Sequence, residues 1–164
     1  REGWLGCAGE ESAGASFRRF DGRPFSTDKD GILMGLLAAE LMAKRGQAPD
    51  ALYEALAETL GRPYYARKDL PVSPEAKARL ARLSTKEVHP ATLAGEPVLQ
   101  VLDRATANGE PLGGIKVVAA NAWFAVRPSG TEDVAKVYAE SFLGEAHLER
   151  VLEEATALLH KALA

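Results

Sequence analysis

The last third of the sequence places a strand with two different faces directly before an amphipathic helix. In residues 136–142, Val137, Ala139 and Ser141 alternate with Lys136, Tyr138 and Glu140. This two-residue period is typical of a strand with one covered face. The next segment has one apolar stripe at helical spacing, made of Leu148, Val151, Leu152, Ala155, Leu158, Leu159 and Leu163. The stripe predicts a final helix that packs on the covered face of a sheet.

Short β-rich segments precede this strand and complete the sheet. They are residues 64–67, 98–102, 115–119 and 123–127. The last two are joined around Asn121, which predicts a hairpin. Ser73 followed by proline predicts the start of a helix that extends through Leu80 to Leu83, because serine caps helices and proline suits their first turn. Antiparallel strands with short turns between helices predict an α+β fold, in which helices cover one side of an antiparallel sheet.

The first third of the sequence predicts glycine-rich loops over residues 1–31, followed by two helices. The first helix begins near Thr27 or Asp28, with Thr27 and Asp30 as a capping pair, and ends at Gly46. Its apolar residues lie on nearly every face, which is typical of a helix packed inside a larger body. The second helix spans about residues 50–60 and has one apolar stripe.

The sequence Gly61-Arg62-Pro63 has the composition of a domain boundary. We therefore expect two parts, residues 1–61 and residues 62–164. Few residues before the first helix are available to cover its apolar faces, and the chain starts at Arg1 without an initiating Met. We therefore expect this chain to be the C-terminal part of a longer polypeptide, with the upstream domains of that polypeptide as its partners.

The composition is that of an ordinary globular protein, with 46% hydrophobic and 26% charged residues. A net charge of −3 argues against general nucleic-acid binding. No apolar segment is long enough to span a membrane, so neither nucleic acid nor a membrane is an expected partner, and the expected location is cytoplasmic. The lone Cys7 excludes an intrachain disulfide, and the three dispersed histidines form no ligand cluster. We expect the histidines to be surface or terminal residues.

One loop between two predicted strands gathers groups that bind anions. It reads Arg127-Pro128-Ser129-Gly130-Thr131-Glu132. Arginine pairs two phosphate oxygens at once, the two hydroxyls can donate hydrogen bonds, and glycine allows backbone N–H groups to face an anion. The alternative is an ordinary hairpin turn, since Pro, Ser, Gly and Thr are common turn residues.

A second polar cluster, Glu10, Glu11 and Ser12, lies in the first glycine-rich segment. Carboxylates and a hydroxyl at adjacent positions can accept hydrogen bonds from sugar hydroxyls. The alternative is a solvated turn, because carboxylates usually face water.

Three motifs occur together, and their order and separation are more specific than any one of them. They are Gly9-Glu10-Glu11-Ser12, Lys29-Asp30-Gly31 and Arg127-Pro128-Ser129-Gly130-Thr131-Glu132. In this arrangement the chain resembles the α-D-phosphohexomutase family over its whole length, and its bacterial, glucose-specific phosphoglucomutase branch above all.

The resemblance implies both a fold and an activity. Residues 1–61 would be the helical end of an α/β domain, the third of four, and residues 62–164 the C-terminal, TATA-box-binding-protein-like domain. The family activity is the interconversion of glucose 1-phosphate and glucose 6-phosphate through glucose 1,6-bisphosphate. A phosphoserine and a Mg²⁺ site would lie in upstream domains, so we expect this chain alone to be inactive. Alternatives are a phosphomannomutase, a phosphoglucosamine mutase or a non-catalytic phosphate-binding module.

The resemblance also implies roles for individual residues. Glu10 and Ser12 would bind sugar hydroxyls, and Lys29 would be the catalytic cation or general acid/base. The non-transferring phosphate would be bound by Arg127, Ser129, Gly130 and Thr131. Lys136 stands where many relatives have an arginine that reaches the same phosphate, and lysine offers one point charge in place of a fork.

Overall fold

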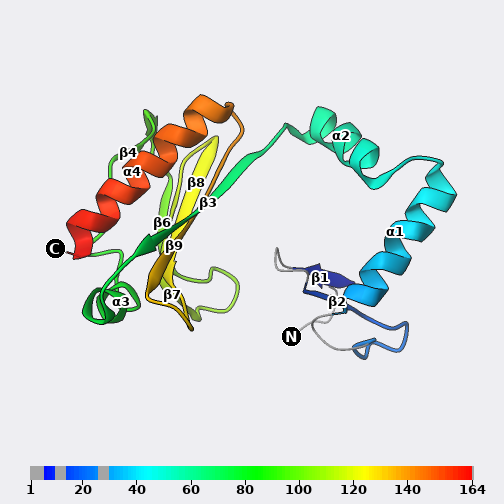
Figure 1. The fold of residues 1–164 in the computed structure, drawn as a ribbon, viewed down its shortest axis with the longest axis horizontal. Helices are drawn as coiled ribbons and strands as arrows, with labels where there is room; N and C mark the ends of the chain where they lie inside the picture. Colours follow the sequence, from blue (N-terminus) through cyan, green and yellow to red (C-terminus); the bar gives the residue numbers. More distant parts are fainter. Residues whose placement is uncertain (1–5, 10–13, 26–29, 164) are drawn as a thin grey trace. The chain divides into compact units, whose positions relative to one another are not determined.

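The computed structural model describes residues 6–9, 14–25 and 30–163 (Figure 1). The described chain forms two compact units, Arg1–Leu60 and Gly61–Ala164. Each unit is considered by itself below.

The second unit is built on a five-stranded antiparallel sheet with strand order β3-β9-β8-β7-β6 (Figure 1). Its strands are β3 (Tyr64–Pro71), β6 (Gln100–Arg104), β7 (Pro111–Val118), β8 (Ala122–Pro128) and β9 (Val134–Ser141). The predicted hairpin around Asn121 is present as the turn from β7 to β8. Strand β3 enters at one edge and pairs with β9 along its whole length, from Tyr64 opposite Ser141 to Pro71 opposite Val134.

The helices α3 (Pro74–Leu80) and α4 (Glu145–Leu163) pack on one face of this sheet. The covered face of β9 is the predicted one, because Val137, Ala139 and Ser141 are fully buried. The stripe of α4 meets them through Val151, Ala155 and Leu159, which are at most 1% exposed. The α+β expectation is thereby confirmed, and the opposite face of the sheet carries the polar residues that matter below.

Helix α3 starts as predicted and ends earlier than predicted. Ser73 caps it by accepting a hydrogen bond from the Ala76 amide at 3.2 Å. The helix stops at Leu80, and Leu83 follows in a tight turn in which its amide donates to the Leu80 carbonyl. Shorter i→i+3 bonds of this kind commonly tighten the end of a helix. Leu83 nonetheless joins the core, being 4% exposed.

Several strands differ from their predicted bounds; β7, for example, begins at Pro111 and not at residue 115. Strand β3 extends to Pro71, four residues beyond the predicted strand, because its partner β9 is long enough to pair with it. Strand β6 begins at Gln100 and not at Val98, whose amide donates to the Ala91 carbonyl outside the sheet. A small hairpin of β4 (Thr92–Leu93) and β5 (Glu96–Pro97) was not predicted from the sequence.

The histidines were expected to be surface or terminal residues, and His147 is terminal but not at the surface. This residue lies in the first turn of α4 and is 4% exposed, and its Nδ1 is 2.8 Å from the Ser141 hydroxyl oxygen. Ser141 is the polar residue at the end of the covered face of β9, so it offers the ring a buried partner. Helical phase alone would have found this position, since His147 precedes Leu148 on the side of α4 that faces the sheet.

The first unit contains β1 (Cys7–Gly9), β2 (Ala15–Phe17), α1 (Gly31–Arg45) and α2 (Pro49–Leu60). Helix α1 begins at Gly31, later than predicted, because the Asp30 side chain caps it by accepting from the Leu33 amide at 2.8 Å. It ends at Gly46 as expected. No residue of α1 is buried, and Ile32 and Leu36 are 81% and 63% exposed. In the described part of the chain, no helix is both long enough and apolar enough to cross a membrane.

Candidate functional site

The sequence predicted to bind an anion forms the loop between β8 and β9, as expected. Arg127 and Pro128 are the last residues of β8, and residues 129–133 turn the chain into β9. The register pairs Arg127 with Lys136, so their side chains start from opposing positions on the same face of the sheet. The Ser129 amide donates to the Val134 carbonyl at 2.9 Å and closes the base of the loop.

Arg127 is exposed, and among the described residues its side chain makes one hydrogen bond, to the neighbouring strand. Its Nη2 donates to the Tyr138 hydroxyl oxygen at 2.9 Å, and its guanidinium carbon lies 5.5 Å from the centre of the Tyr138 ring. A guanidinium has five N–H donors. The fork of Arg127 therefore keeps donors that point to solvent and can bind an anion.

Lys136 lies between two carboxylates. Its Nζ is 3.4 Å from a Glu132 carboxylate oxygen and 4.0 Å from an Asp69 carboxylate oxygen. Asp69 is bound in turn by both nitrogens of the Arg67 fork, at 2.9 and 2.8 Å. The hydrogen bond from Arg67 lowers the pKa of Asp69, and the charge of Lys136 lowers it further. The hydrogen bond to Asp69 in turn raises the pKa of Arg67.

The charges around the loop sum to a local excess of one positive charge. The cations are Arg67, Lys77, Arg127 and Lys136, and the carboxylates are Asp69, Glu132 and Asp133. Of the four cations, Arg127 is the one without a carboxylate in these pairs. It is therefore the principal attraction for an anion that approaches this part of the sheet.

The far side of the loop is fixed by α3 and by the end of β3. The Lys77 ammonium donates to the Glu132 carbonyl at 2.8 Å and lies 3.6 Å from the Asp133 carboxylate. The Val72 amide donates to the Asp133 carbonyl at 3.0 Å. These contacts hold Glu132 and Asp133, at the end of the loop, against α3 and the residue after β3. A loop that is held in place before a ligand arrives loses less conformational entropy on binding.

The predicted hydroxyl and glycine groups differ in how accessible they are. Gly130 and Thr131 are exposed at the tip of the loop, whereas Ser129 is only 3% exposed. Gly130 does not have a positive φ, and a Cβ added there meets no atom within 4 Å. The fold itself therefore does not require glycine at this position, contrary to the turn argument from the sequence.

This geometry gives the first prediction. Gly130→Ala is expected to leave the free energy of unfolding unchanged within about 0.5 kcal/mol, since the added methyl group enters open space. If an anion approaches the backbone N–H groups of the loop, the methyl group occupies part of its space and lowers the affinity for inorganic phosphate. Urea denaturation and a phosphate titration of the same variant measure the two effects. Unchanged affinity would show that the anion does not approach the loop backbone.

The other predicted site residues, Glu10, Ser12 and Lys29, lie outside the described residues. The structure describes their surroundings up to Gly9, where β1 ends, and from Ala15, where β2 begins. These two residues are paired in an antiparallel ladder. This strand pairing was not predicted from the sequence.

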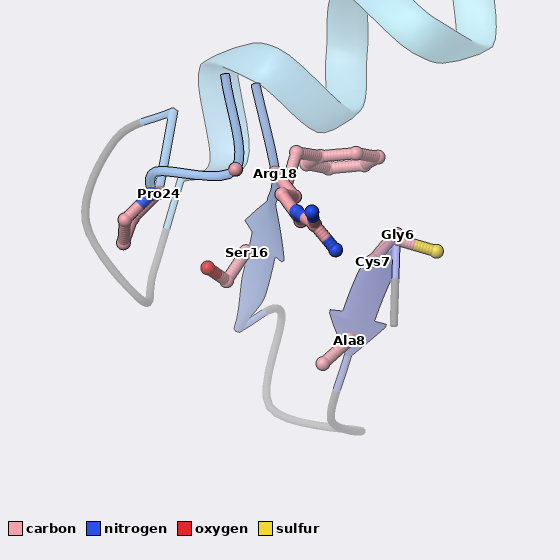
Figure 2. Close-up of a pocket in the computed structure, with 8 residues that line it drawn as sticks. Gly6, Cys7, Ala8, Ser16, Arg18 and Pro24 are labelled. Atoms are coloured by element: carbon pink, nitrogen blue, oxygen red, sulfur yellow. The ribbon is translucent and has the colours of Figure 1, made fainter. Parts of the chain in front are cut away.

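A small cavity lies beside this hairpin (Figure 2). It is lined by Gly6, Cys7, Ala8, Ser16, Phe17, Arg18, Gly22 and Pro24. Figure 2 shows Cys7 and Ala8 on β1, with Ser16 and Arg18 on the adjacent segment. Its volume of about 190 Å³ is smaller than that of usual ligand pockets, which is about 300–1,000 Å³. We assign no function to it.

The described residues contain no group of three or more His, Cys, Asp or Glu side chains that is placed to bind a metal ion. The acidic residues near the loop, Asp69 and Glu132, are instead engaged with Arg67 and Lys136.

Two family models match this chain. Residues 75–158 match the C-terminal domain of the phosphoglucomutase/phosphomannomutase family. The chain belongs to this family. Residues 1–60 match the α/β/α domain III of phosphoglucomutase/phosphomannomutase proteins, so the two units carry the family's third and C-terminal domain sequences in order. The α-D-phosphohexomutase resemblance is thereby confirmed.

Individual relatives support the same assignment. The chain is 55% identical over 153 residues to a phosphoglucomutase of Komagataeibacter xylinus, which covers 93% of this chain and 28% of that protein. Its fold is similar to the crystal structure of a phosphoglucomutase/phosphomannomutase family protein of Burkholderia thailandensis, with a TM-score of 0.59 and 22% identity. That match covers 96% of this chain and 28% of the other. The chain thus spans about a quarter of the length of these phosphoglucomutase/phosphomannomutase proteins.

Sequence reasoning missed several residues that contact the 129–133 loop or its flanking cations from other elements. Tyr138 could have been found, because it is two residues from Lys136 and so lies on the same face of the strand. Asp69 gave no such signal, since the strand that contains it was predicted to end at Arg67. Lys77 contacts the loop across 55 residues of sequence, which no local pattern reports.

Proposed function

We propose that this chain supplies the phosphate-binding and sugar-binding loops of a phosphoglucomutase, which interconverts glucose 1-phosphate and glucose 6-phosphate through glucose 1,6-bisphosphate. The observation that carries the proposal is the exposed Arg127 fork at the end of β8, beside Lys136 and the tip of the 129–133 loop. The similarity to a protein named phosphoglucomutase supports glucose as the sugar of the substrate.

The loop would bind the phosphate group that is not being transferred. Arg127 donates two hydrogen bonds to its oxygens, Thr131 adds a hydroxyl, and the exposed backbone N–H groups complete the contact. Lys136 contributes charge, although Glu132 and Asp69 compete with the phosphate for its ammonium. Holding one end of the substrate in this way orients the sugar for reaction at the other end.

Glu10 would accept hydrogen bonds from sugar hydroxyls, and Ser12 would accept or donate them. Lys29 would stabilise the transferring phosphoryl group. A cation at that point offsets the negative charge that develops during phosphoryl transfer. A magnesium ion, bound outside this chain, would supply further electrostatic stabilisation of the same group. The phosphoserine nucleophile would also lie outside this chain.

The proposal is tested by titrating the isotopically labelled chain with glucose 1-phosphate, mannose 1-phosphate and inorganic phosphate, followed by NMR. All three are expected to shift the amide signals of Ser129, Gly130 and Thr131, and glucose 1-phosphate is expected also to shift those of Glu10 and Ser12. The amides of α4 around Arg150, on the covered face of the sheet, are the internal control.

Each result has a distinct meaning. Shifts at Glu10 and Ser12 that are as large with mannose 1-phosphate would replace the glucose assignment with a phosphomannomutase. Loop shifts without any response at Glu10 and Ser12 would favour a phosphate-binding module. No loop response to any phosphate would reject the phosphate site.

A further inference from the structure

The positions of Arg127 and Tyr138 on neighbouring strands bring their side chains together on the open face of the sheet. The register of β8 and β9 pairs Arg127 with Lys136 and Ala125 with Tyr138, so Arg127 and Tyr138 are diagonal neighbours. Long side chains reach one another across such a diagonal. The small residue Ala125, directly opposite Tyr138, leaves room for the arginine to extend over the ring.

Tyr138 is held more firmly than the arginine it contacts. It is only 9% exposed, whereas Arg127 is an exposed residue at the end of its strand. An exposed arginine samples many rotamers, and fixing them costs conformational entropy when a ligand binds. The ring contact at 5.5 Å and the hydrogen bond at 2.9 Å restrict these rotamers before any ligand is present.

A second arginine on the other side of the ring does not compete for the phenol oxygen. Arg67 is the register partner of Tyr138 on β3. Its Nε and one terminal nitrogen, Nη2, both donate to Asp69, at 2.9 and 2.8 Å. The Tyr138 oxygen is therefore left to accept from Arg127. The direction is fixed by chemistry, because a guanidinium is only a donor.

We propose that Tyr138 is a positioning residue that holds Arg127 in the orientation in which its remaining N–H groups face the phosphate. The inference rests on the proposed function, because the phosphate is the ligand for which the arginine is oriented. Asp69 assists indirectly, because it accepts the hydrogen bonds of Arg67.

The test is a double-mutant cycle in which affinity for inorganic phosphate is measured for the 164-residue chain, Tyr138→Phe, Arg127→Ala and the double variant. Phenylalanine keeps the ring and removes the hydroxyl. Loss of one hydrogen bond is expected to weaken phosphate binding about three- to tenfold in Tyr138→Phe. The same substitution is expected to change nothing when Arg127 is already alanine, because Tyr138 acts through it. Tyr65→Phe removes a hydroxyl from the same sheet face and is the matched control.

A second readout does not depend on phosphate. In the free chain, the guanidinium N–H signals of Arg127 are expected to exchange slowly and to be resolved by NMR, and to broaden or merge in Tyr138→Phe but not in Tyr65→Phe. If phosphate does not bind at all but these signals respond, the proposed function fails while Tyr138 still holds the arginine.

Three results would overturn the proposal. The first is unchanged Arg127 signals in Tyr138→Phe. The second is unchanged phosphate affinity in that variant when the wild-type chain binds phosphate. The third is an equal loss of affinity with and without Arg127, since Tyr138 would then act on the phosphate by itself.

Discussion

Replacing Arg127 with alanine is expected to weaken the affinity of the chain for inorganic phosphate by about tenfold to a hundredfold. Hydrogen bonds to charged groups contribute about 1.5–3 kcal/mol, and about 1.4 kcal/mol corresponds to a factor of ten. In the ion pairs around the loop, the guanidinium of Arg127 has no carboxylate partner, whereas Arg67 and Lys136 both contact Asp69. Isothermal titration calorimetry or NMR at fixed salt measures the change.

Two further variants separate the fork from the charge. Arg127→Lys keeps the positive charge and loses the bidentate geometry, so its affinity is expected to lie between those of wild type and alanine. Arg150→Ala removes the same charge from an exposed position of α4, which covers the other face of the sheet. It is expected to have little effect, since charges in water are screened by salt. Equal losses in the Arg150 and Arg127 variants would mean that overall charge, and not this site, attracts phosphate.

The fold of the second unit was predictable from the sequence because local pattern and packing agree there. The alternation in β9 and the stripe on α4 each specify a buried face, and the structure brings Val137 and Val151 into one core. The turn at Asn121 and the cap at Ser73 are local signals that need no distant partner. The prediction failed at edges, where the length of a strand such as β3 is set by a partner far away in the sequence.

The candidate site was predictable only in part. The Arg127 loop was found because its chemistry is contiguous in sequence. The groups that set the environment of its cations come from other strands: Tyr138 beside Arg127, and Asp69 beside Lys136. Their contribution depends on register, and register follows from strand pairing rather than from any motif. The buried position of His147 differs, because it follows from helical phase alone: His147 lies four residues before Val151 on the buried side of α4.

The close approach of two strands also explains a glycine that no sequence motif singles out. Gly114 lies buried in β7, next to the end of β8 where Arg127 is held. A Cβ added to Gly114 would lie 2.0 Å from the Val126 carbonyl oxygen and 3.0 Å from the Arg127 Cα. Backbone atoms cannot move aside as the end of a flexible side chain can. The close approach of these two strands therefore requires glycine at this position.

Gly114→Ala is accordingly expected to lower the free energy of unfolding of the second unit by about 3 kcal/mol, the upper part of the range for overpacked cores. A small domain has only about 5–15 kcal/mol in total, so this is a large loss. Urea denaturation followed by circular dichroism measures it. Gly130→Ala is the matched control, because the same change at the loop tip meets no atom within 4 Å.

The same clash has a consequence for binding. Because the added methyl group would displace the backbone at Val126 and Arg127, a folded fraction of Gly114→Ala is expected to bind phosphate more weakly than wild type even where Arg127 is intact. A 1 Å displacement of a positioning group is enough to reduce catalysis strongly in enzymes generally. Denaturation midpoints that coincide for the Gly114 and Gly130 variants would show that β7 and β8 separate at little cost, and would remove the role assigned to Gly114.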